Sequence, residues 1–185
     1  GFEPKDFFNT GSNVQNNVSL TIGNNKNQSY VSIGTTNAAG IIPNNKYNRY
    51  NFTFRNTTTF LNDKLTLDVG VNYVNQNDCN LMSQGQYFNP LVPLYLFPRG
   101  ESFDAIRTFE VYDQARGIYV QNWNFGDALQ MQNPYWVANR MNRTNNKHRY
   151  MANASLKYNI LDWLDVAGRI RFDRTNNKAE DKRYA

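Results

Sequence analysis

Residues able to do acid–base, nucleophilic or metal chemistry are scarce in this sequence. His148 is the only histidine, and it lies between Lys147 and Arg149 at the start of an alternating segment. One histidine is too few for a histidine-rich metal site and leaves little for a catalytic triad. Cys79 is the only cysteine, so the chain can form no internal disulfide. We therefore expect no enzyme, no metal site and no cofactor.

Aromatic and amide side chains within residues 77–147 are better candidates for binding. Aromatic rings can stack on sugars or grip peptide side chains, and amides can hydrogen-bond hydroxyl groups or backbone. A segment of this length also needs a small core of its own, and NPLVPLYLFPRG and QNPYW suit that structural role. Trp123 is the first choice for a direct substrate contact. The predicted substrate-binding set is Tyr87, Tyr119, Asn122, Trp123, Asn124, Tyr135 and Trp136.

The elements that would position these residues are predicted from alternation of apolar and polar residues with period two, which indicates β-strands. Short turns follow at 24–27, 61–63 and near 161–163, whereas the connections at 37–46 and 77–147 are longer. The predicted strands cover residues 14–22, 29–35, 50–60, 65–73, 150–160 and 164–172.

Strand length separates two classes of β protein. Strands of soluble sandwiches usually have about five or six residues, whereas a strand crossing a bilayer needs roughly nine to eleven. Four of the predicted strands reach the longer range. Short turns at one end and long connections at the other are typical of an outer-membrane barrel with periplasmic turns and extracellular loops. The predicted fold is an all-β, antiparallel transmembrane barrel segment of about six strands with one long extracellular loop.

Charged residues opposite the apolar phase are predicted to face the lumen. A charge facing lipid near the midplane costs roughly 2–4 kcal/mol, so the Val, Leu, Ile and Phe phase is placed outward. The predicted lumen-facing residues are Arg55, Asp68, Lys157, Arg169 and Arg171.

Tyrosines near strand ends suggest aromatic girdles at the two membrane interfaces. Tyr50 and Tyr73 are expected as neighbours at the outer end of one hairpin, and Tyr150 and Tyr158 bracket a later strand. The alternative is ordinary cross-strand aromatic pairing in a soluble sheet.

The composition keeps a second class open. A mean hydropathy of −0.72 with 15% aromatic residues also suits a secreted soluble β-module that binds glycans, whose strands would form two sheets packed face to face. A passive porin is a third alternative. The net charge of +5 is spread along the chain, so we expect no nucleic-acid partner. No stretch approaches the length of a transmembrane helix.

Several long segments resemble the SusC/RagA-like group of TonB-dependent outer-membrane transporters of Bacteroidetes. The similarity lies in FFNTGSNVQNNVSLTIGNNKNQSYVSIG, GIIPNNKYNRYNFTFR, DKLTLDVGVNY, NPLVPLYLFPRG, QNPYWVANR and RYMANASLKYNILDWLDVAGRIRFD. These segments cover most of the chain, and none of them is a catalytic signature.

The resemblance implies a barrel of roughly twenty-two strands with an internal plug, located in the outer membrane and surrounded by its lipid. Such a transporter imports oligosaccharides or peptides with a SusD-like surface lipoprotein, and the inner-membrane TonB complex drives it through the plug. The chain is expected to be a barrel fragment that lacks the plug and starts downstream of any signal peptide. Its expected parts are strands one to four in 1–76, the long loop in 77–147, and strands five and six in 148–185.

Overall fold

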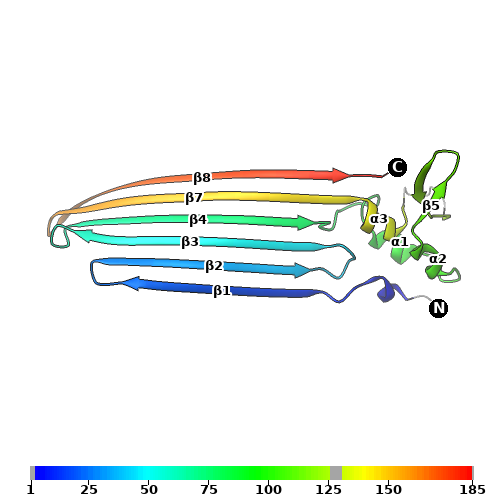
Figure 1. Cartoon of the computed structure of the whole chain (residues 1–185), viewed down its shortest axis with the longest axis horizontal. Coiled ribbons are helices and arrows are strands. Elements are labelled where there is room, and N and C mark those ends of the chain that lie inside the picture. The colour runs from blue at the N-terminus through cyan, green and yellow to red at the C-terminus, as the bar shows by residue number, and fades with distance from the viewer. Residues whose placement is uncertain (1–2, 126–130, 185) are drawn as a thin grey trace.

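The computed structural model describes residues 3–125 and 131–184 and contains one large antiparallel sheet with a smaller structure at one end (Figure 1). Six long strands lie in the order β1-β2-β3-β4-β7-β8, and β5 and β6 form a separate hairpin. We call the segment between β4 and β7, residues 80–141, the cap. The elements are η1 (Pro4–Phe7), β1 (Ser12–Gly23), β2 (Asn27–Ala39), β3 (Lys46–Phe60), β4 (Leu65–Cys79), α1 (Leu91–Leu96), α2 (Phe103–Arg107), β5 (Glu110–Asp113), β6 (Ile118–Gln121), α3 (Pro134–Arg140), β7 (Asn142–Leu161) and β8 (Leu164–Lys182).

The all-β prediction is confirmed, because most of the described chain lies in antiparallel strands. The six long strands contain the six that alternation predicted. Within the described residues, β1 and β8 are the two edges of the sheet, which does not close on itself. No helix in that part of the chain is long and apolar enough to cross a bilayer.

The strand register places side chains of one kind on one face of the sheet. One row of paired residues reads Leu20, Val31, Phe54, Val71, Ala152 and Phe172 from β1 to β8. The adjacent row, whose side chains point to the other side, reads Thr21, Tyr30, Arg55, Gly70, Asn153 and Arg171. Successive side chains of a strand alternate between faces. The sheet therefore has an apolar face, which carries the first row, and a polar face, which carries the second row.

Turn chemistry explains the tight connections, which all lie at the end of the sheet away from the cap (Figure 1). Asn24 accepts hydrogen bonds from the backbone N–H groups of Lys26 and Asn27, both at 2.9 Å. Leu61, Asn62 and Asp63 all have positive φ, between 52° and 65°, which reverses the chain in three residues. The predicted turns at 24–27, 61–63 and near 161–163 are thus confirmed to within a residue.

The long strands extend further toward the cap than alternation predicted. β4 continues to Cys79 and β7 begins at Asn142, so the predicted loop at 77–147 spans 80–141 between the strands. In these extensions, polar side chains occupy both faces, for example Asn75 and Gln76 of β4. The backbone ladder continues there because pairing needs N–H and C=O groups, not apolar side chains. Residues 1–2 and 185, at the ends of the predicted parts 1–76 and 148–185, lie outside the described residues, as do residues 126–130 of the predicted loop.

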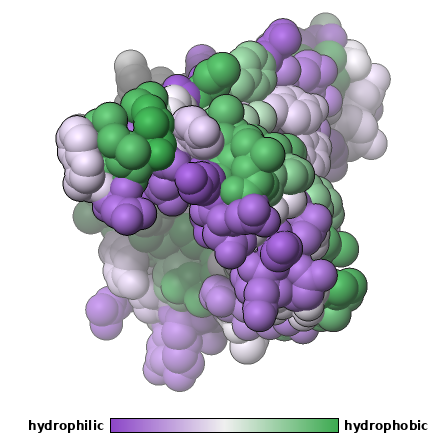
Figure 2. Space-filling view, turned by 90° about the vertical axis from the view of Figure 1, so that its left-hand side faces the viewer, coloured by the Kyte–Doolittle hydropathy of each residue, from purple (hydrophilic) through white to green (hydrophobic). Residues whose placement is uncertain are grey.

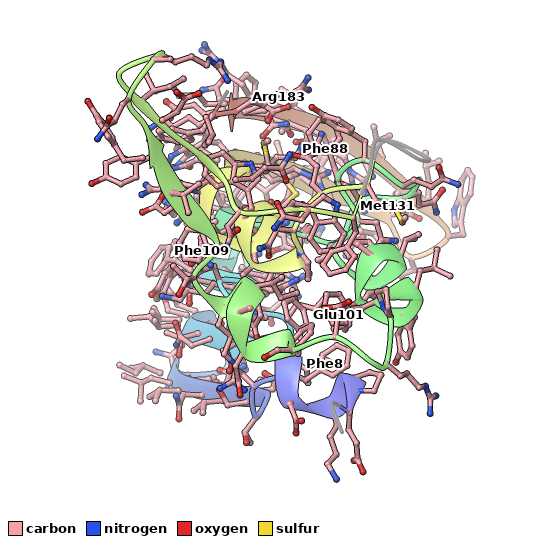
Figure 3. The ribbon with its side chains drawn as sticks, turned by 90° about the vertical axis from the view of Figure 1, so that its right-hand side faces the viewer. Phe8, Phe88, Glu101, Phe109, Met131 and Arg183 are labelled. Atoms are coloured by element: carbon pink, nitrogen blue, oxygen red, sulfur yellow. The ribbon has the colours of Figure 1, made fainter. Side chains whose placement is uncertain are left out.

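Within its described residues, the cap contains three short helices and the β5–β6 hairpin, and period-two alternation predicts none of them (Figure 3). Asn133 caps α3 by accepting hydrogen bonds from the N–H groups of Tyr135 and Trp136, and Pro134 occupies the first helical turn. Asp113 accepts from the N–H groups of Ala115 and Arg116, which forms the turn of the hairpin.

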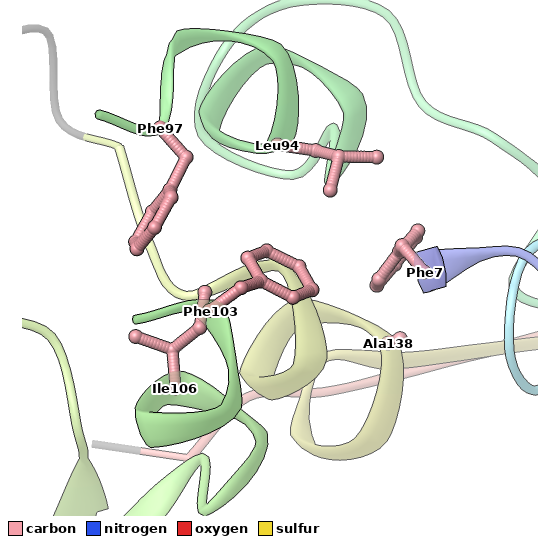
Figure 4. Packing of buried hydrophobic residues seen from close by; sticks show 6 residues of the cluster. All are labelled: Phe7, Leu94, Phe97, Phe103, Ile106 and Ala138. Carbon is pink, nitrogen blue, oxygen red and sulfur yellow. The ribbon is translucent and has the colours of Figure 1, made fainter. Parts of the chain in front are cut away.

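The cap has its own hydrophobic core, as a segment of this length requires. The core consists of two clusters of buried residues, and the smaller one contains Trp136, Val137 and Met141. The residues of the larger cluster converge from η1, α1, α2, α3 and the chain after α1 (Figure 4). They are Phe7, Leu94, Phe97, Phe103, Ile106 and Ala138.

Asparagines join the cap to the end of the sheet. The Asn44 and Asn80 amides both donate to the Ala138 carbonyl, at 3.0 and 3.2 Å. Asn45 donates in turn to the Asn80 carbonyl at 3.0 Å. Asn44 and Asn80 have positive φ, which asparagine tolerates better than most residues. The β2–β3 connection and the end of β4 therefore hold α3 in place.

Phe7 gives the N-terminal segment a structural role in the cap, because its side chain is buried between α1 and α3 although it precedes β1. Phe7→Ala would leave a cavity and should destabilise the cap by about 3–5 kcal/mol. We expect amide hydrogen exchange to accelerate in α1, α2 and α3, with β3 and β4 unchanged. The control Tyr95→Ala truncates an exposed aromatic of α1 and should leave exchange unaltered. Unchanged exchange in Phe7→Ala would show that Phe7 does not support the cap.

Candidate functional site

The polar face brings together the five charged residues that were predicted to face a lumen. Arg55 lies on β3, Asp68 on β4, Lys157 on β7, and Arg169 and Arg171 on β8. Their positions in the register place all five on the polar face. Whether that face lines a lumen remains a prediction.

Two of these residues have polar partners. Lys157 forms an ion pair with Asp165 at 3.4 Å, and Asp68 accepts a hydrogen bond from the Thr57 hydroxyl at 3.4 Å. Both interactions are largely exposed, so they add little to stability.

The three arginines of the set have no ion-pair partner among residues 3–125 and 131–184. They border a shallow hollow of about 470 Å³ over β3, β4, β7 and β8. Asp68, Asn153 and Asp173 also line it. The hollow is therefore basic, with amide and carboxylate groups at its sides.

Glycine shapes the floor of this hollow. A Cβ atom on Gly70 would lie 2.5 Å from Oδ1 of Asn153, its neighbour on β7. The same arrangement occurs at Gly34, where a Cβ would lie 2.4 Å from Oδ1 of Asn51. Glycine at these positions leaves room for the amide of the next strand to lie across the sheet.

Sequence patterns missed an ion pair on the same face. Arg149 of β7 and Asp173 of β8 form a two-point contact, with Nε of Arg149 donating to Oδ1 of Asp173 at 3.0 Å. The residues are 24 positions apart, and only their diagonal position across the β7–β8 pairing brings them together. Alternation indicated the correct face for both residues but not their contact.

The predicted substrate-binding aromatics divide into buried and exposed groups. Trp136 is 1% exposed and belongs to the cap core, so its side chain packs and offers no surface to a ligand. Tyr135 is half-buried against Phe7 and Phe103, with ring centroids at 5.0 and 5.6 Å. A hydrogen bond from Arg107 engages the Tyr135 hydroxyl and is the main cause of the raised pKa of Arg107.

Trp123, the first choice for a substrate contact, is also a packing residue in this structure. Its ring centroid lies 5.1 Å from that of Phe125 and 6.3 Å from that of Phe97. Its indole Nε1 is buried and has no hydrogen-bond partner among the described residues. A role in direct recognition stays a prediction, and the observed contacts are those of a cap-core side chain.

Tyr119 and Tyr87 are the predicted aromatics that remain open to solvent. Tyr119 pairs across the hairpin with Tyr112, and the two rings meet edge to face at 5.3 Å. They are 57% and 55% exposed. Alternation within residues 77–147 is too short to predict this hairpin, so Tyr112 was not among the candidates. The tyrosine pair is an exposed aromatic surface of the cap formed by two side chains in contact.

The predicted amides behave differently from one another. Asn122 donates to the carbonyls of Ala105 and Thr108, so its amide holds the chain between α2 and β6. Asn124 is exposed and makes no side-chain hydrogen bond within the described residues. Of the two, only Asn124 has an amide free to meet a ligand.

Asn133 is the amide on which the cap depends most. It is 0% exposed, and its Nδ2 donates to the carbonyls of Ile106 and Asn122, both at 2.8 Å. Its Oδ1 caps α3, and its backbone N–H donates to the side chain of Gln121. A single buried side chain thus connects α2, β6 and α3.

No group of three or more His, Cys, Asp and Glu side chains lies close enough together to bind a metal ion, within the part of the chain that the structure describes. Cys79 is a free thiol. His148 hydrogen-bonds the Tyr73 hydroxyl through Nδ1 at 2.8 Å, on the apolar face.

No protein-family model matches the chain, and a search of curated proteins finds no match.

Asn133→Ala should destabilise the cap by about 2–4 kcal/mol, because it removes the helix cap and leaves two buried carbonyls without donors. We expect the cap to unfold at a lower denaturant concentration. Hydrogen exchange of α2 and α3 measures this midpoint. Asn124→Ala, nine residues away and exposed, is the matched control and should change the free energy of unfolding by less than about 0.5 kcal/mol. Equal effects of the two substitutions would contradict the assigned role of Asn133.

Proposed function

We propose that this chain forms part of the wall and one extracellular cap of a TonB-dependent outer-membrane transporter of the SusC/RagA type. In this proposal the apolar face contacts lipid and the polar face lines the lumen. The short turns are periplasmic, and the cap lies outside the cell. Four features of the sheet support the placement in the membrane, and the resemblance of the sequence supports the choice of transporter.

The first feature is the exposure of the apolar face. Large side chains such as Val18 and Ile170 are 73% and 76% exposed. Within the described residues, neither a second sheet nor a helix covers them. A soluble β-module would bury this face against a second sheet. Figure 2, which looks from the short-turn end, likewise has hydrophobic side chains at the surface, and Trp163 and Leu61 are exposed there.

The second feature is the height of the apolar stretch. We call the apolar stretches of β1, β3, β4, β7 and β8 together the apolar band, which is continuous on β4, β7 and β8 and is interrupted by Asn16 on β1 and by Asn56 and Thr58 on β3. It spans eight to ten residue steps, or about 27–33 Å along a strand. Its limits are Val14 and Ile22 on β1, Tyr50 and Phe60 on β3, Leu65 and Tyr73 on β4, Tyr150 and Ile160 on β7, and Leu164 and Phe172 on β8.

The third feature, which carries the proposal, is that the apolar band crosses the strands obliquely. Ile22 ends the band on β1, and Ile170 lies directly across the sheet from it, yet on β8 the band continues to Leu164. At the other edge, Val14 lies across from Lys178, and the band on β8 stops at Phe172. Both edges of the band therefore shift by six residues between β1 and β8.

The shift corresponds to a strand tilt. Six residues rise about 20 Å, and the five strand spacings from β1 to β8 span about 24 Å, which gives an inclination of about 40°. Strands of membrane barrels tilt by about 35–45°. With this tilt the band is about 21–25 Å high, close to the roughly 25 Å apolar height of such barrels. A tilt of this size is what closing a sheet into a barrel requires, and the uncovered apolar face supports a barrel in lipid.

The fourth feature is the edge of the band nearest the cap, where aromatic residues gather. Tyr73 pairs directly with Phe52 and Tyr150, and the Tyr73 and Tyr150 ring centroids are 5.0 Å apart. Tyr50 lies two residues further out on β3 and is the diagonal neighbour of Tyr73, at the end of the hairpin where the sequence placed both tyrosines. Tyrosine is favoured at the membrane interface, where its ring is apolar and its hydroxyl is hydrated.

The edges of the sheet require further strands in the complete protein. Unpaired N–H and C=O groups along β1 and β8 would be costly in lipid, so a membrane barrel must be closed. We propose that β1 and β8 pair with other strands of the same transporter, in a barrel of roughly twenty-two. The plug, the TonB complex, the SusD-like lipoprotein and an oligosaccharide or peptide substrate enter the proposal through the resemblance.

A lysine placed on the apolar face separates the membrane proposal from a soluble glycan-binding module. In lipid, Leu20→Lys should lower the unfolding free energy by about 2–4 kcal/mol, because its charge would lie in the hydrocarbon layer. Ser19→Lys, the adjacent position on the polar face, should change it by less than about 0.5 kcal/mol. Denaturant titration of the complete protein refolded in lipid vesicles measures both. A neutral or stabilising Leu20→Lys would rule out contact between this face and lipid.

The exposed tyrosine pair of the β5–β6 hairpin is the cap surface that we expect to contribute to recognition. Tyr119→Ala should reduce substrate uptake by about five- to tenfold, since truncating one aromatic contact costs on the order of 1 kcal/mol or more. The amount of protein in the outer membrane should not change, because Tyr119 lies outside the cap core. Tyr95→Ala, an exposed aromatic on α1, is the control. Normal uptake with Tyr119→Ala would exclude this hairpin from recognition.

A further inference from the structure

The four basic side chains that β7 places on the polar face differ in their partners. Three of them form ion pairs with carboxylates of β8, namely Arg143 with Asp181, Arg149 with Asp173 and Lys157 with Asp165. Lys147 has no ion-pair partner among residues 3–125 and 131–184, and neither has Arg49 of β3. Both lie on interior strands, so the neighbouring strands on either side are present. Their charges remain available to an anion from outside the sheet.

The strand register places Arg49 and Lys147 on either side of one amide. Both are direct neighbours of Gln76 on β4, so two strand spacings, or about 10 Å, separate their Cα atoms. Their outer neighbours, Thr36 on β2 and Asn177 on β8, carry no charge. Arginine and lysine side chains are long and flexible. The two charged ends can therefore meet over Gln76 and contact one small anion together.

The polar face is hollowed around these two cations, with a volume of about 220 Å³. Within the part of the chain that the structure describes, no Asp or Glu side chain lines this hollow. Arg149 also lines it, but Asp173 already engages that guanidinium from outside the lining. Three amides complete its polar lining: Asn51, Asn72 and Gln76.

Asp78 is the closest carboxylate in the register, as a diagonal neighbour of both cations. Its side chain accepts hydrogen bonds from the amides of Gln76 and Asn145, at 3.3 and 3.5 Å, and the residue is 8% exposed. It forms no ion pair with Arg49 or Lys147 in the described residues. One carboxylate offsets at most one of the two charges, so the hollow keeps a net positive charge.

We propose that this hollow binds a carboxylate of the transported substrate, which is then an acidic oligosaccharide. The inference rests on the proposed function, which places the polar face in the lumen. Guanidinium and ammonium groups donate to carboxylate oxygens, and such charged hydrogen bonds are stronger than neutral ones. The three amides offer donors and acceptors to hydroxyl groups of the same sugar. Among the described residues, only Val74 and Met151 line the hollow with apolar side chains, which offers little to a peptide.

The first test titrates the complete, detergent-solubilised protein with trigalacturonate and with its uncharged methyl ester, by calorimetry. The wild type should prefer the acid. Arg49→Gln with Lys147→Gln should weaken binding of the acid by about tenfold, which corresponds to roughly 1.4 kcal/mol from two exposed ion pairs. Lys46→Gln with Arg174→Gln removes the same charge from the apolar face and should weaken binding by less than about twofold, because salt screens distant charges.

Gln76 provides a second test within the same hollow. Gln76→Glu places a carboxylate between Arg49 and Lys147, where it pairs with them in place of the substrate. Binding of trigalacturonate should then fall by about tenfold or more. Gln76→Ala also removes the donor to Asp78 but adds no charge, and it should cost about threefold, as for one neutral hydrogen bond. The heat-modifiable gel mobility of the protein shows that each variant is folded.

Each other outcome has a distinct meaning. Equal affinity for the acid and its ester, or an equal loss in the Lys46/Arg174 variant, would overturn the inference. Tighter binding of triglutamate than of trigalacturonate would show a peptide substrate and overturn it too. An Arg49/Lys147 variant that unfolds earlier but binds trigalacturonate normally would assign the hollow to a carboxylate of the protein itself.

Detergent dependence separates failure of this inference from failure of the proposed function. A protein that needs detergent to stay folded but does not prefer the acid overturns the inference and leaves the transporter proposal standing. A protein that stays folded and soluble without detergent overturns both.

Discussion

Strand register is the constraint on which the rest of this structure depends. Each of the five strand pairs in the sheet is antiparallel, and their registers are in step, so that Leu20 and Phe172 belong to the same row although five strand spacings separate them. A slip of one residue in any pair would send every side chain of the following strands to the other face. The tight turn through Leu61, Asn62 and Asp63, with its positive φ values, helps to hold the β3–β4 register.

The same registers stagger the short turns, and this stagger inclines the apolar band. The end of β1 lies opposite the middle of β8. A band that crosses the strands obliquely therefore contains a different segment of each strand. The proposed tilt and the proposed lipid-facing surface therefore come from one geometric cause. On the opposite face, the same rows bring Arg55 and Arg171 to the two sides of Gly70 and Asn153, and produce the basic hollow.

The cap combines a rigid interior with a small accessible surface. Asn133 and the side chains around Phe7 hold three short helices together, although these helices are too short to be stable alone. Buried Trp136 and packed Trp123 contribute to that interior. Tyr112 and Tyr119 project from the hairpin and leave the interior undisturbed. Because the exposed tyrosines are not part of the packed interior, the loop surface can vary while the sheet and cap keep their structure.

The sequence by itself determined the strands, their apolar and polar faces, and the positions of the tight turns. Alternation is a local property, which residues such as Phe52, Phe54 and Arg55 show independently of the rest of the chain. It also indicated that Arg169 and Arg171 share a face with Asp68. Strand ends were underestimated, because the polar extensions around Asn75 and Asn146 contain no apolar alternation, and their pairing depends on backbone hydrogen bonds.

Only the tertiary structure decided what the cap residues do. Trp136 and Tyr119 are both aromatic residues in a segment without sustained alternation. QNPYW suited a structural role, but no local pattern showed which aromatic rings of the segment are buried. Burial depends on contacts with distant residues, such as Phe7, which precedes the first strand and still reaches the cap core. The Arg149–Asp173 pair, the amide over Gly70 and the oblique course of the apolar band likewise arise from strand pairing. Strand pairing depends on the geometry of every turn in the sheet, so no single segment of the sequence determines it.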